Sequence, residues 1–214
     1  KRRNFRGTSK MTKLIICYIG QDVEDFLPLS LDSVKDIASA IVFIDGGSKD
    51  RTLDILQSYN FYDMTEDQKV GRYSQYADDK CKKLLLKRPY EHDLKTANGR
   101  ARNYYLDFVK KYFKGWICLV LDPDEIVDER FKDFIKSDEA QNMKENHLLS
   151  IHMRHTIRDL GHEDATINQH FVHNRMFIVN EDLEYPETEH PVLFSKNPDV
   201  RYGYTNMFTI WHIS

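Results

Sequence analysis

Residues 116–125 read Trp-Ile-Cys-Leu-Val-Leu-Asp-Pro-Asp-Glu, and this stretch decides the fold. Trp116–Leu121 is the most apolar run in the chain, which predicts a buried central strand of an α/β sheet. The strand ends abruptly in Asp122-Pro123-Asp124. Two carboxylates so close together are costly, because unit charges ~4 Å apart repel by about 4 kcal/mol at an effective dielectric of about 20. A divalent cation with oxygen ligands would remove that cost, and the alternative interpretation is a solvated turn at the end of a strand.

Strands and helices alternate on the amino-terminal side of this stretch, which is typical of a sheet with crossover helices. The expected strands are Leu14–Ile19, Ala40–Ile44 and Lys83–Lys87. The expected helices are Val23–Val34, a second from Ser48 or Asp50 to about Ser58, and a third from Asn98 to about Phe113. The polar stretch Asn60–Asp79 lacks a clean period, so it predicts a long loop or a short irregular helix.

Polar residues follow three of the predicted strands, in the segments Gly20-Gln21-Asp22, Asp45-Gly46-Gly47-Ser48 and Asp122-Pro123-Asp124. Ligands bind beyond the carboxyl ends of the strands in an open α/β sheet, so we expect these side chains to converge on one site. Each segment alone is also explained by turn residues or helix caps, because Asp serves in both.

The charged residues after the Asp pair have a simpler interpretation. Glu125, Asp128 and Glu129 are expected in the exposed first turn of the next helix, where their charge suits the helix dipole.

Beyond about Ser137 the helical pattern gives way to strands joined by polar connections. These expected strands are Leu148–Arg154, Phe171–Val179, Val192–Phe194 and Met207–His212. They predict an antiparallel extension that shares the core of the first half. No linker rich in Gly, Pro or Ser separates the halves, and 214 residues suit one domain. We therefore expect a single domain over residues 11–214, preceded by a flexible arm or cloning remnant at residues 1–10.

The charge of the chain argues against one class of partner. Lys and Arg number 31 and Asp and Glu 34, which gives a net charge of −3. Five of the basic residues lie in the first ten positions, so from Met11 onward the balance is 26 minus 34, or −8. An acidic body does not suit a protein that follows a phosphate backbone by charge, so no nucleic-acid partner is expected.

The cysteines and the hydropathy pattern bear on the compartment. Cys17, Cys81 and Cys118 are not spaced as a metal knuckle or a redox pair, so we expect buried free thiols in a reducing environment. No apolar run approaches the ~18–20 residues of a membrane span. The basic amino-terminus has no apolar core behind it, as a secretory signal would. These features predict a soluble, cytoplasmic protein without a transmembrane segment.

Four segments, in order, resemble the motifs of family 2 glycosyltransferases, which have the GT-A fold. Leu14–Ile19 with its polar turn resembles their first nucleotide-binding strand. Residues 44–52, Ile-Asp-Gly-Gly-Ser-Lys-Asp-Arg-Thr, resemble their V-D-D-G-S-x-D-x-T segment, and residues 98–103, Asn-Gly-Arg-Ala-Arg-Asn, resemble their G-x-x-x-A-R-N helix start. Leu121–Glu125 resembles their L-D-x-D-E/D segment. The resemblance implies a Rossmann-like mixed α/β sheet flanked by helices, with an antiparallel carboxy-terminal extension.

The resemblance also implies roles for individual residues. Asp45, with Ser48 beside it, would bind the base or ribose of a nucleotide sugar, and Arg102 would lie near the diphosphate. Asp122 and Asp124 would bind that diphosphate through Mn²⁺ or Mg²⁺. Two departures from the family pattern stand out. The first turn reads Gly20-Gln21-Asp22 where the family usually has Asn-Glu, and Gly46 replaces the usual second Asp.

The activity that the resemblance implies is a metal-dependent, inverting transfer of a sugar, of the hexosyltransferase type. The donor would be a nucleotide-diphospho-sugar, with UDP favoured, and the acceptor would be a hydroxyl of a glycan, a lipid-linked molecule or a protein. Residues 11–127 would form the nucleotide-sugar-binding half and residues 137–214 the acceptor half. The sequence leaves the sugar, the acceptor and the oligomeric state open.

Inverting transfer needs a carboxylate that takes the proton of the acceptor hydroxyl. In the second half, Gly161-His162-Glu163-Asp164 resembles the Glu-Asp element that holds this base in relatives, so Asp164 is the first candidate. The segment Tyr185–His190 resembles the G-x-x-H-E element of others, which makes Glu189 the rival. Two further acids stay open for the role, Asp159 and Glu187.

Histidines gather in the second half, and two of them are candidate metal ligands. His190 and His212 lie at or near late strands, and the resemblance implies that a late histidine supplies a third ligand. Their spacing is not that of a zinc finger or a zincin helix. A hydrogen-bonded, partly buried histidine is the alternative for each.

Two other functions remain open at this point. A strand followed by Asp-x-Asp is also the nucleophile motif of haloacid-dehalogenase-like phosphatases, although that family expects Thr or Val after the pair and places it near the amino-terminus. Here Glu125 and Ile126 follow, and the motif lies in mid-chain. A non-catalytic nucleotide-sugar-binding module is the second alternative.

Overall fold

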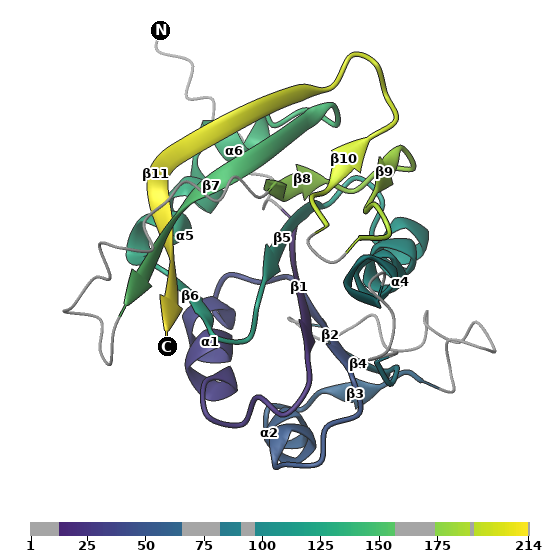
Figure 1. Cartoon of the computed structure of the whole chain (residues 1–214). Coiled ribbons are helices and arrows are strands. Elements are labelled where there is room, and N and C mark those ends of the chain that lie inside the picture. The colour runs from purple at the N-terminus through teal and green to yellow at the C-terminus, as the bar shows by residue number, and fades with distance from the viewer. Residues whose placement is uncertain (1–12, 66–81, 91–96, 157–173, 189–190, 214) are drawn as a thin grey trace, which may run out of the picture.

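A mixed sheet, strongly twisted from one edge to the other, carries the fold (Figure 1). The computed structural model describes residues 13–65, 82–90, 97–156, 174–188 and 191–213. Within these ranges the sheet has nine strands in the order β3-β4-β2-β1-β5-β8-β7-β11-β6. A separate antiparallel pair joins β9 (Leu183–Glu184) to β10 (Phe194–Ser195).

The first half of the sheet is parallel, as the alternation of strands and helices predicts. Its strands are β1 (Leu14–Gly20), β2 (Ala40–Asp45), β3 (Tyr62–Asp63), β4 (Lys82–Lys87) and β5 (Ile117–Leu121). Every residue of β1, β2 and β5 is buried, because helices or the second half of the chain cover both faces. Burial on both faces explains why these strands are continuous apolar runs.

The second half extends the sheet beyond β5. Its strands are β6 (Glu125–Val127), β7 (His147–Thr156), β8 (Asn174–Ile178) and β11 (Arg201–Ile213). β8 runs antiparallel to both β5 and β7, and β6 runs antiparallel to β11. The expected mixed α/β sheet with an antiparallel extension is confirmed. One pair differs from the expectation, because β7 and β11 run parallel.

Two hydrophobic cores lie on opposite faces of the sheet. Leu14, Ile16 and Tyr18 of β1 point into the first core, and Ile15 and Cys17 point into the second. This alternation is the two-residue period of a strand.

Different helices cover the two faces. The first core is covered by α1 (Leu27–Val34), α2 (Thr52–Ser58), α5 (Glu129–Lys136) and α6 (Asp138–Gln141). The second core is covered by α4 (Ala97–Tyr112), whose Tyr105, Phe108 and Val109 are buried as their spacing predicts. Because α4 begins at Ala97, Asn98 lies inside its first turn rather than before it.

The expectation for Glu125 is wrong. Glu125 is 1% exposed and opens the short strand β6, where it pairs with His212 of β11. The next helix, α5, begins only at Glu129, and Asp128 caps it by accepting a hydrogen bond from the Phe131 N–H at 3.1 Å. A pairing with a strand far along the chain has overridden the local helix signal.

Two smaller features also depend on the tertiary structure. The short strand β3 lies in the stretch expected to be a loop or irregular helix, where it pairs with β4. Cys17 and Cys118 are buried free thiols, as expected, with their sulfur atoms 3.5 Å apart. Cys81 lies outside the described residues.

Candidate functional site

The turn that follows β5 is closed by hydrogen bonds between its two ends. The Asp122 N–H donates to Glu125 Oε2 at 2.7 Å, and the Glu125 N–H donates to the Asp122 carbonyl at 3.0 Å. Pro123 packs against Gly20 of β1, where a Cβ atom would lie 2.7 Å from the proline ring. The turn is therefore fixed against the end of β1, and Gly20 leaves the room that the proline needs.

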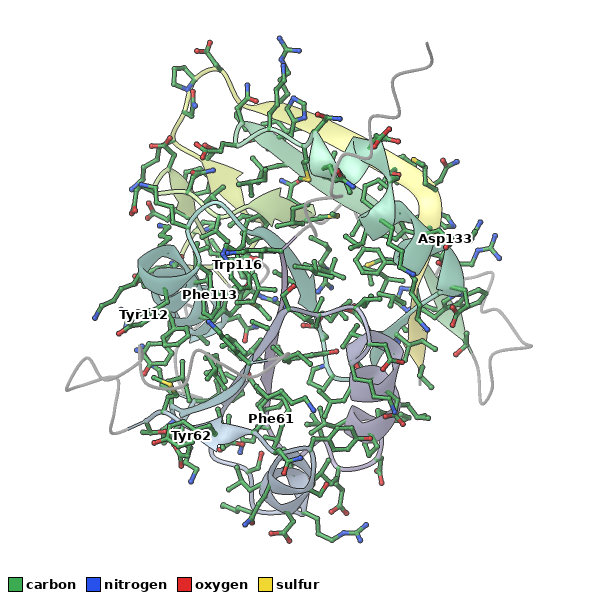
Figure 2. All side chains as sticks on the ribbon, turned by 180° about the vertical axis from the view of Figure 1, so that it is seen from behind. Phe61, Tyr62, Tyr112, Phe113, Trp116 and Asp133 are labelled. Carbon is green, nitrogen blue, oxygen red and sulfur yellow. The ribbon has the colours of Figure 1, made fainter. Side chains whose placement is uncertain are left out.

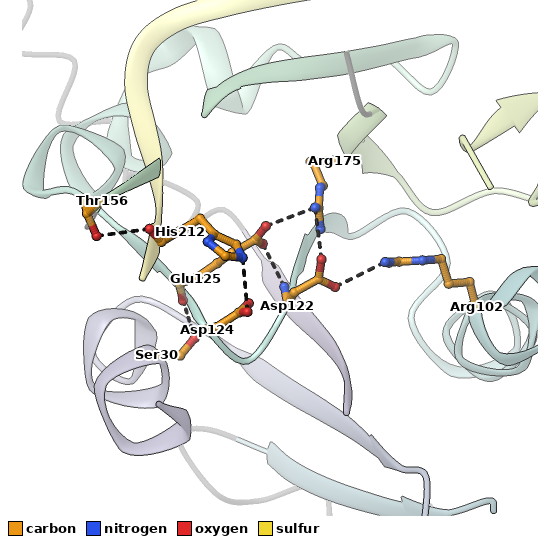
Figure 3. Close-up of polar contacts among 8 residues, drawn as sticks. All are labelled: Ser30, Arg102, Asp122, Asp124, Glu125, Thr156, Arg175 and His212. Atoms are coloured by element: carbon orange, nitrogen blue, oxygen red, sulfur yellow. Dashed lines mark hydrogen bonds and ion pairs between the residues drawn. The ribbon is translucent and has the colours of Figure 1, made fainter. Parts of the chain in front are cut away.

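Asp122 is the centre of an ion-pair cluster (Figure 3). Its Oδ1 lies 3.2 Å from Arg102 Nη2, and its Oδ2 lies 3.1 Å from Arg175 Nη2. Burial disfavours the charged carboxylate, yet the two guanidinium groups outweigh burial and hold the pKa of Asp122 well below its usual range. Asp122 is therefore ionised at neutral pH with both oxygens engaged by arginines.

Arg175 also holds Glu125. Its Nη2 atom lies 3.0 Å from Glu125 Oε1, and these side chains are 8% and 1% exposed. Burial raises the pKa of Glu125 above its usual range, with Arg175 opposing the shift and the Asp122 charge adding to it. One buried guanidinium therefore bridges the first and last acids of the turn. Sequence reasoning did not single out Arg175, and the available signal was a basic residue directly before the apolar run Met176–Ile178 of a strand.

Asp124 and His212 form a second pair at this turn (Figure 3). Asp124 Oδ2 lies 3.1 Å from His212 Nε2, and the Asp124 carbonyl accepts a hydrogen bond from the Ile213 N–H at 2.8 Å. The hydrogen bond to Asp124 raises the pKa of His212, and burial opposes that shift. The Asp124 side chain is 36% exposed, so this pair meets solvent more than Glu125 does. Both residues are metal ligands in the interpretation of the sequence, and the structure brings them together.

Asp122, Asp124 and His212 are the described residues that the sequence predicts as metal ligands, and Asp124 with His212 is the pair in direct contact. Both oxygens of Asp122 contact arginines, so Asp124 carries the carboxylate that is free of arginine in this turn. Within the part of the chain that the structure describes, no three His, Cys, Asp or Glu side chains form a metal cluster. A carboxylate oxygen and an imidazole nitrogen are nevertheless a donor set that suits Mn²⁺, with its other positions left for a ligand.

Asp45 closes the turn after β2. The Asp45 carboxylate accepts hydrogen bonds from the Gly47 N–H at 3.0 Å and the Ser48 N–H at 3.2 Å, and the residue is 2% exposed. Ser48 Oγ accepts in turn from the Asp22 N–H at 3.0 Å, which ties this turn to the one after β1. Asp45 therefore shapes this loop, in agreement with the turn role that its residue type allows.

Gly46 stands where the resembled family has a second Asp, and in this structure there is no room for a side chain at that position. A Cβ atom at Gly46 would lie 2.4 Å from the ring of Tyr90, whose N–H donates to the Gly46 carbonyl at 3.0 Å. Burial raises the pKa of Tyr90, with Arg102 opposing the shift and Asp122 and Asp45 adding to it. Tyr90 therefore lies within reach of the charges of both turns, and sequence reasoning missed it because no motif marks it.

The amino-terminal end of α4 is held by the segment after β9. Gly99 allows close contact, because a Cβ atom there would lie 2.2 Å from the Pro186 carbonyl oxygen. The Asn103 amide exchanges two hydrogen bonds with the Tyr185 backbone, at 2.8 and 2.9 Å. These contacts fix the helical turn from which Arg102 reaches Asp122.

The remaining candidates have different outcomes. Glu187 forms an exposed ion pair with Arg100, at 3.1 Å, at the start of α4. The other acids proposed as the base, and one proposed metal ligand, lie outside the described residues, namely Asp159, Asp164, Glu189 and His190.

Comparison with known proteins finds similarity at the level of structure. No protein-family model matches the chain, and no curated protein matches it in sequence. The crystal structure of S. aureus TarS 1–349 matches with a TM-score of 0.52 and 16% identity, over 82% of this chain and 51% of that one. The same fragment in complex with UDP-GlcNAc matches with a TM-score of 0.53 and 14% identity, over 91% of this chain and 59% of that one.

These matches bear on the fold. They agree with the GT-A-like architecture expected from the motifs, a largely parallel sheet with helices on both faces and antiparallel strands at its end. The chain spans between half and three-fifths of the length of these two TarS 1–349 chains. Among the described residues, no helix is long and apolar enough to cross a membrane.

Proposed function

We propose that the chain is a glycosyltransferase that moves a sugar from a nucleotide-diphospho-sugar to an acceptor hydroxyl. A UDP-sugar is the favoured donor, because the TarS fragment of similar fold was crystallised with UDP-GlcNAc. The motifs of the sequence, which resemble those of family 2 glycosyltransferases, support inversion at the anomeric carbon. The acceptor class is open among glycans, lipid-linked molecules and proteins.

One observation carries this proposal. Arg102 from α4, the Asp122–Asp124 turn after β5 and His212 from β11 meet at the carboxyl end of the parallel strands (Figure 3). Ligands of open α/β sheets bind at this edge. A site that presents guanidinium groups beside a carboxylate–imidazole pair suits a diphosphate and the cation that accompanies it.

Asp124 and His212 are the residues that would hold Mn²⁺ or Mg²⁺. When bound there, the ion would neutralise the diphosphate that leaves the sugar. Asp122 would keep Arg102 at the edge of the site, and Asp45 with Ser48 would shape the loop for the nucleotide. The ligand set from the described residues is small, so the diphosphate oxygens and a residue such as His190 are expected to complete it.

The chemistry of the chain's own residues follows from charge. Positive charge develops on the anomeric carbon as its bond to the diphosphate breaks. The acceptor oxygen bonds to that carbon from the opposite face and loses its proton, so a carboxylate is needed beside the acceptor hydroxyl. Asp164 is proposed to take the acceptor proton, with Glu189 as the rival. Arg102 is proposed to bind the diphosphate, because a guanidinium matches phosphate oxygens in a planar, two-pronged contact.

The proposal is tested with a panel of nucleotide sugars and Mn²⁺, following release of the nucleoside diphosphate. Metal-dependent hydrolysis or transfer with one donor supports a glycosyltransferase. Donor binding without turnover, in the presence of candidate acceptors, supports a binding module instead. Release of phosphate from a generic phosphomonoester, abolished by Asp122→Asn, would favour the phosphatase alternative.

A further inference from the structure

We infer that Arg175 is a positioning residue for the Asp124–His212 pair. The inference rests on the proposed function, because it gives that pair the role of holding the metal ion. No sequence motif marks Arg175, and it reaches the turn from β8, in the half of the sheet that follows the motifs.

The geometry places one atom of Arg175 between two carboxylates. Nη2 lies 3.1 Å from Asp122 Oδ2 and 3.0 Å from Glu125 Oε1. These acids begin and end the four-residue turn that contains Asp124, and the Asp122 N–H donates to the second oxygen of Glu125. The two ends of the turn are thus fixed relative to each other, and Asp124 lies between them.

The far side of the turn is fixed by β11. The strand β6 pairs with β11, and its first residue, Glu125, lies opposite His212. The next residue of β11, Ile213, donates its N–H to the Asp124 carbonyl. His212 therefore comes from a strand that pairs directly with the residue held by Arg175. A shift of Glu125 would change the distance between Asp124 and His212, which is 3.1 Å here.

Packing alone does not explain an arginine at position 175, because burying its guanidinium group lowers the stability of the fold. Its side chain is 8% exposed, and its Nε and Nη1 atoms are buried without a hydrogen-bond partner among the described residues. A buried donor without a partner lowers stability. The alternative role is simple neutralisation of Glu125, a buried carboxylate that needs a cation. The two roles predict different behaviour when the Glu125 charge is removed together with Arg175.

Three variants distinguish these roles. Arg175→Met removes the bridge, and Arg175→Met with Glu125→Gln removes the bridge and the buried charge together. The side-chain amide that Glu125→Gln introduces still offers an oxygen to the Asp122 N–H. Arg175→Lys keeps a positive charge but lacks the planar fork. Lys114→Met, at an exposed ion pair before β5, is the control.

The measurement is Mn²⁺ affinity, from the electron paramagnetic resonance signal of free Mn²⁺, alongside thermal unfolding. Residues that orient metal ligands change affinity by about 10–100-fold when mutated. We expect the double variant to recover thermal stability but to bind Mn²⁺ at least about 10-fold more weakly than the wild type. Arg175→Lys is expected to fold and to bind Mn²⁺ more weakly than Lys114→Met does.

The outcomes separate the inference from the proposed function. A folded double variant, or a folded Arg175→Lys variant, with wild-type Mn²⁺ affinity overturns the positioning role alone. A wild-type protein that binds UDP but no Mn²⁺ overturns the metal role of Asp124 and His212, and the positioning role with it. Should Arg175→Met not fold, the other two variants decide the question.

Discussion

Asp124 Oδ2 lies 3.1 Å from His212 Nε2, which joins the turn after β5 to the carboxyl end of β11. The two residues come from opposite halves of the chain. They meet because β6, which follows Asp124 directly, pairs antiparallel with the last residues of β11. The motif-bearing half and the later half of the sheet thus contribute one residue each to the proposed metal pair.

Asp124→Ala is expected to lower donor turnover by about 100-fold or more, because it removes the carboxylate that would hold the metal ion. His212→Ala is expected to act in the same direction. The fold should persist in both variants, since the Asp124 side chain is 36% exposed and its structural contact to Ile213 uses the backbone. Steady-state release of nucleoside diphosphate, with circular dichroism for the fold, measures both effects.

Asp133→Ala is the matched control for Asp124→Ala. Asp133, labelled in the view from behind in Figure 2, lies on α5 and is exposed. Its substitution should leave turnover unchanged. Full activity of the Asp124→Ala variant would contradict the proposed role of Asp124 in metal binding.

Asp164→Asn is expected to spare donor binding and to slow transfer by about 10²–10⁴-fold, the usual contribution of a general base. Isothermal titration with the donor and Mn²⁺ measures binding, and transfer to an acceptor measures the chemical step. Glu189→Gln is the parallel variant. An active Asp164→Asn protein together with an inactive Glu189→Gln protein would move the base to Glu189.

Gly46→Ala is expected to destabilise the protein by about 1–3 kcal/mol, because the added methyl group would lie 2.4 Å from the Tyr90 ring. In a Tyr90→Ala background the same substitution should cost less, since the ring is absent and Gln21 Cβ, 3.1 Å from the added methyl group, is the close contact that remains. Urea unfolding of the four proteins gives the coupling between the two sites. Equal costs in both backgrounds would show that Tyr90 does not select glycine at this position.

Asp50 gives a prediction about acid stability. Its carboxylate accepts from the Thr52 N–H at 2.9 Å and the Glu24 N–H at 3.0 Å. Burial disfavours the charge, but the hydrogen bonds from Thr52 and Glu24 outweigh it and lower the pKa of Asp50. Because its pKa is lowered by folding, the ionised Asp50 carboxylate adds to the free energy of unfolding. That contribution is complete above the unfolded-state pKa of about 3.9 and is lost as the pH falls through the folded-state pKa.

Asp50→Asn tests whether this contribution to stability decreases as the pH falls. The variant should be less stable than the wild type at pH 7, because a neutral side chain weakens the charge-assisted hydrogen bonds from the Thr52 and Glu24 N–H groups. The difference should shrink as pH falls below about 4. Urea unfolding at several pH values measures it, and Asp54→Asn, exposed on the same helix, is the control. A difference that stays constant with pH would exclude the ionised carboxylate as its source.

The parallel half of the sheet was predictable because its signals are local. Strands buried on both faces must be apolar along their whole length, as Trp116–Leu121 is nearly throughout. The polar residues at the strand ends were visible for the same reason, since a change from apolar to acidic marks where each strand leaves the core. Asp122 and Asp124 therefore stood out from the sequence.

The two arginine contacts were not predictable in the same way. Arg102 lay in a motif, but its pairing with Asp122 was not among the expectations. Arg175 lay in no motif, and its two carboxylate contacts depend on how β8 joins β5 and β7. Glu125 was expected to be exposed because its charge, with those of Asp128 and Glu129, suits the first turn of a helix.

By itself, the sequence determined the order of elements, the buried strands and the acidic turn at the sheet edge. Those features arise from the period of apolar residues and from neighbours in the chain. Only the tertiary structure decided which charges meet: Asp122 with two arginines, Glu125 with Arg175, and Asp124 with His212. Pairing between distant strands sets these contacts, and no local pattern records which strand will lie beside which.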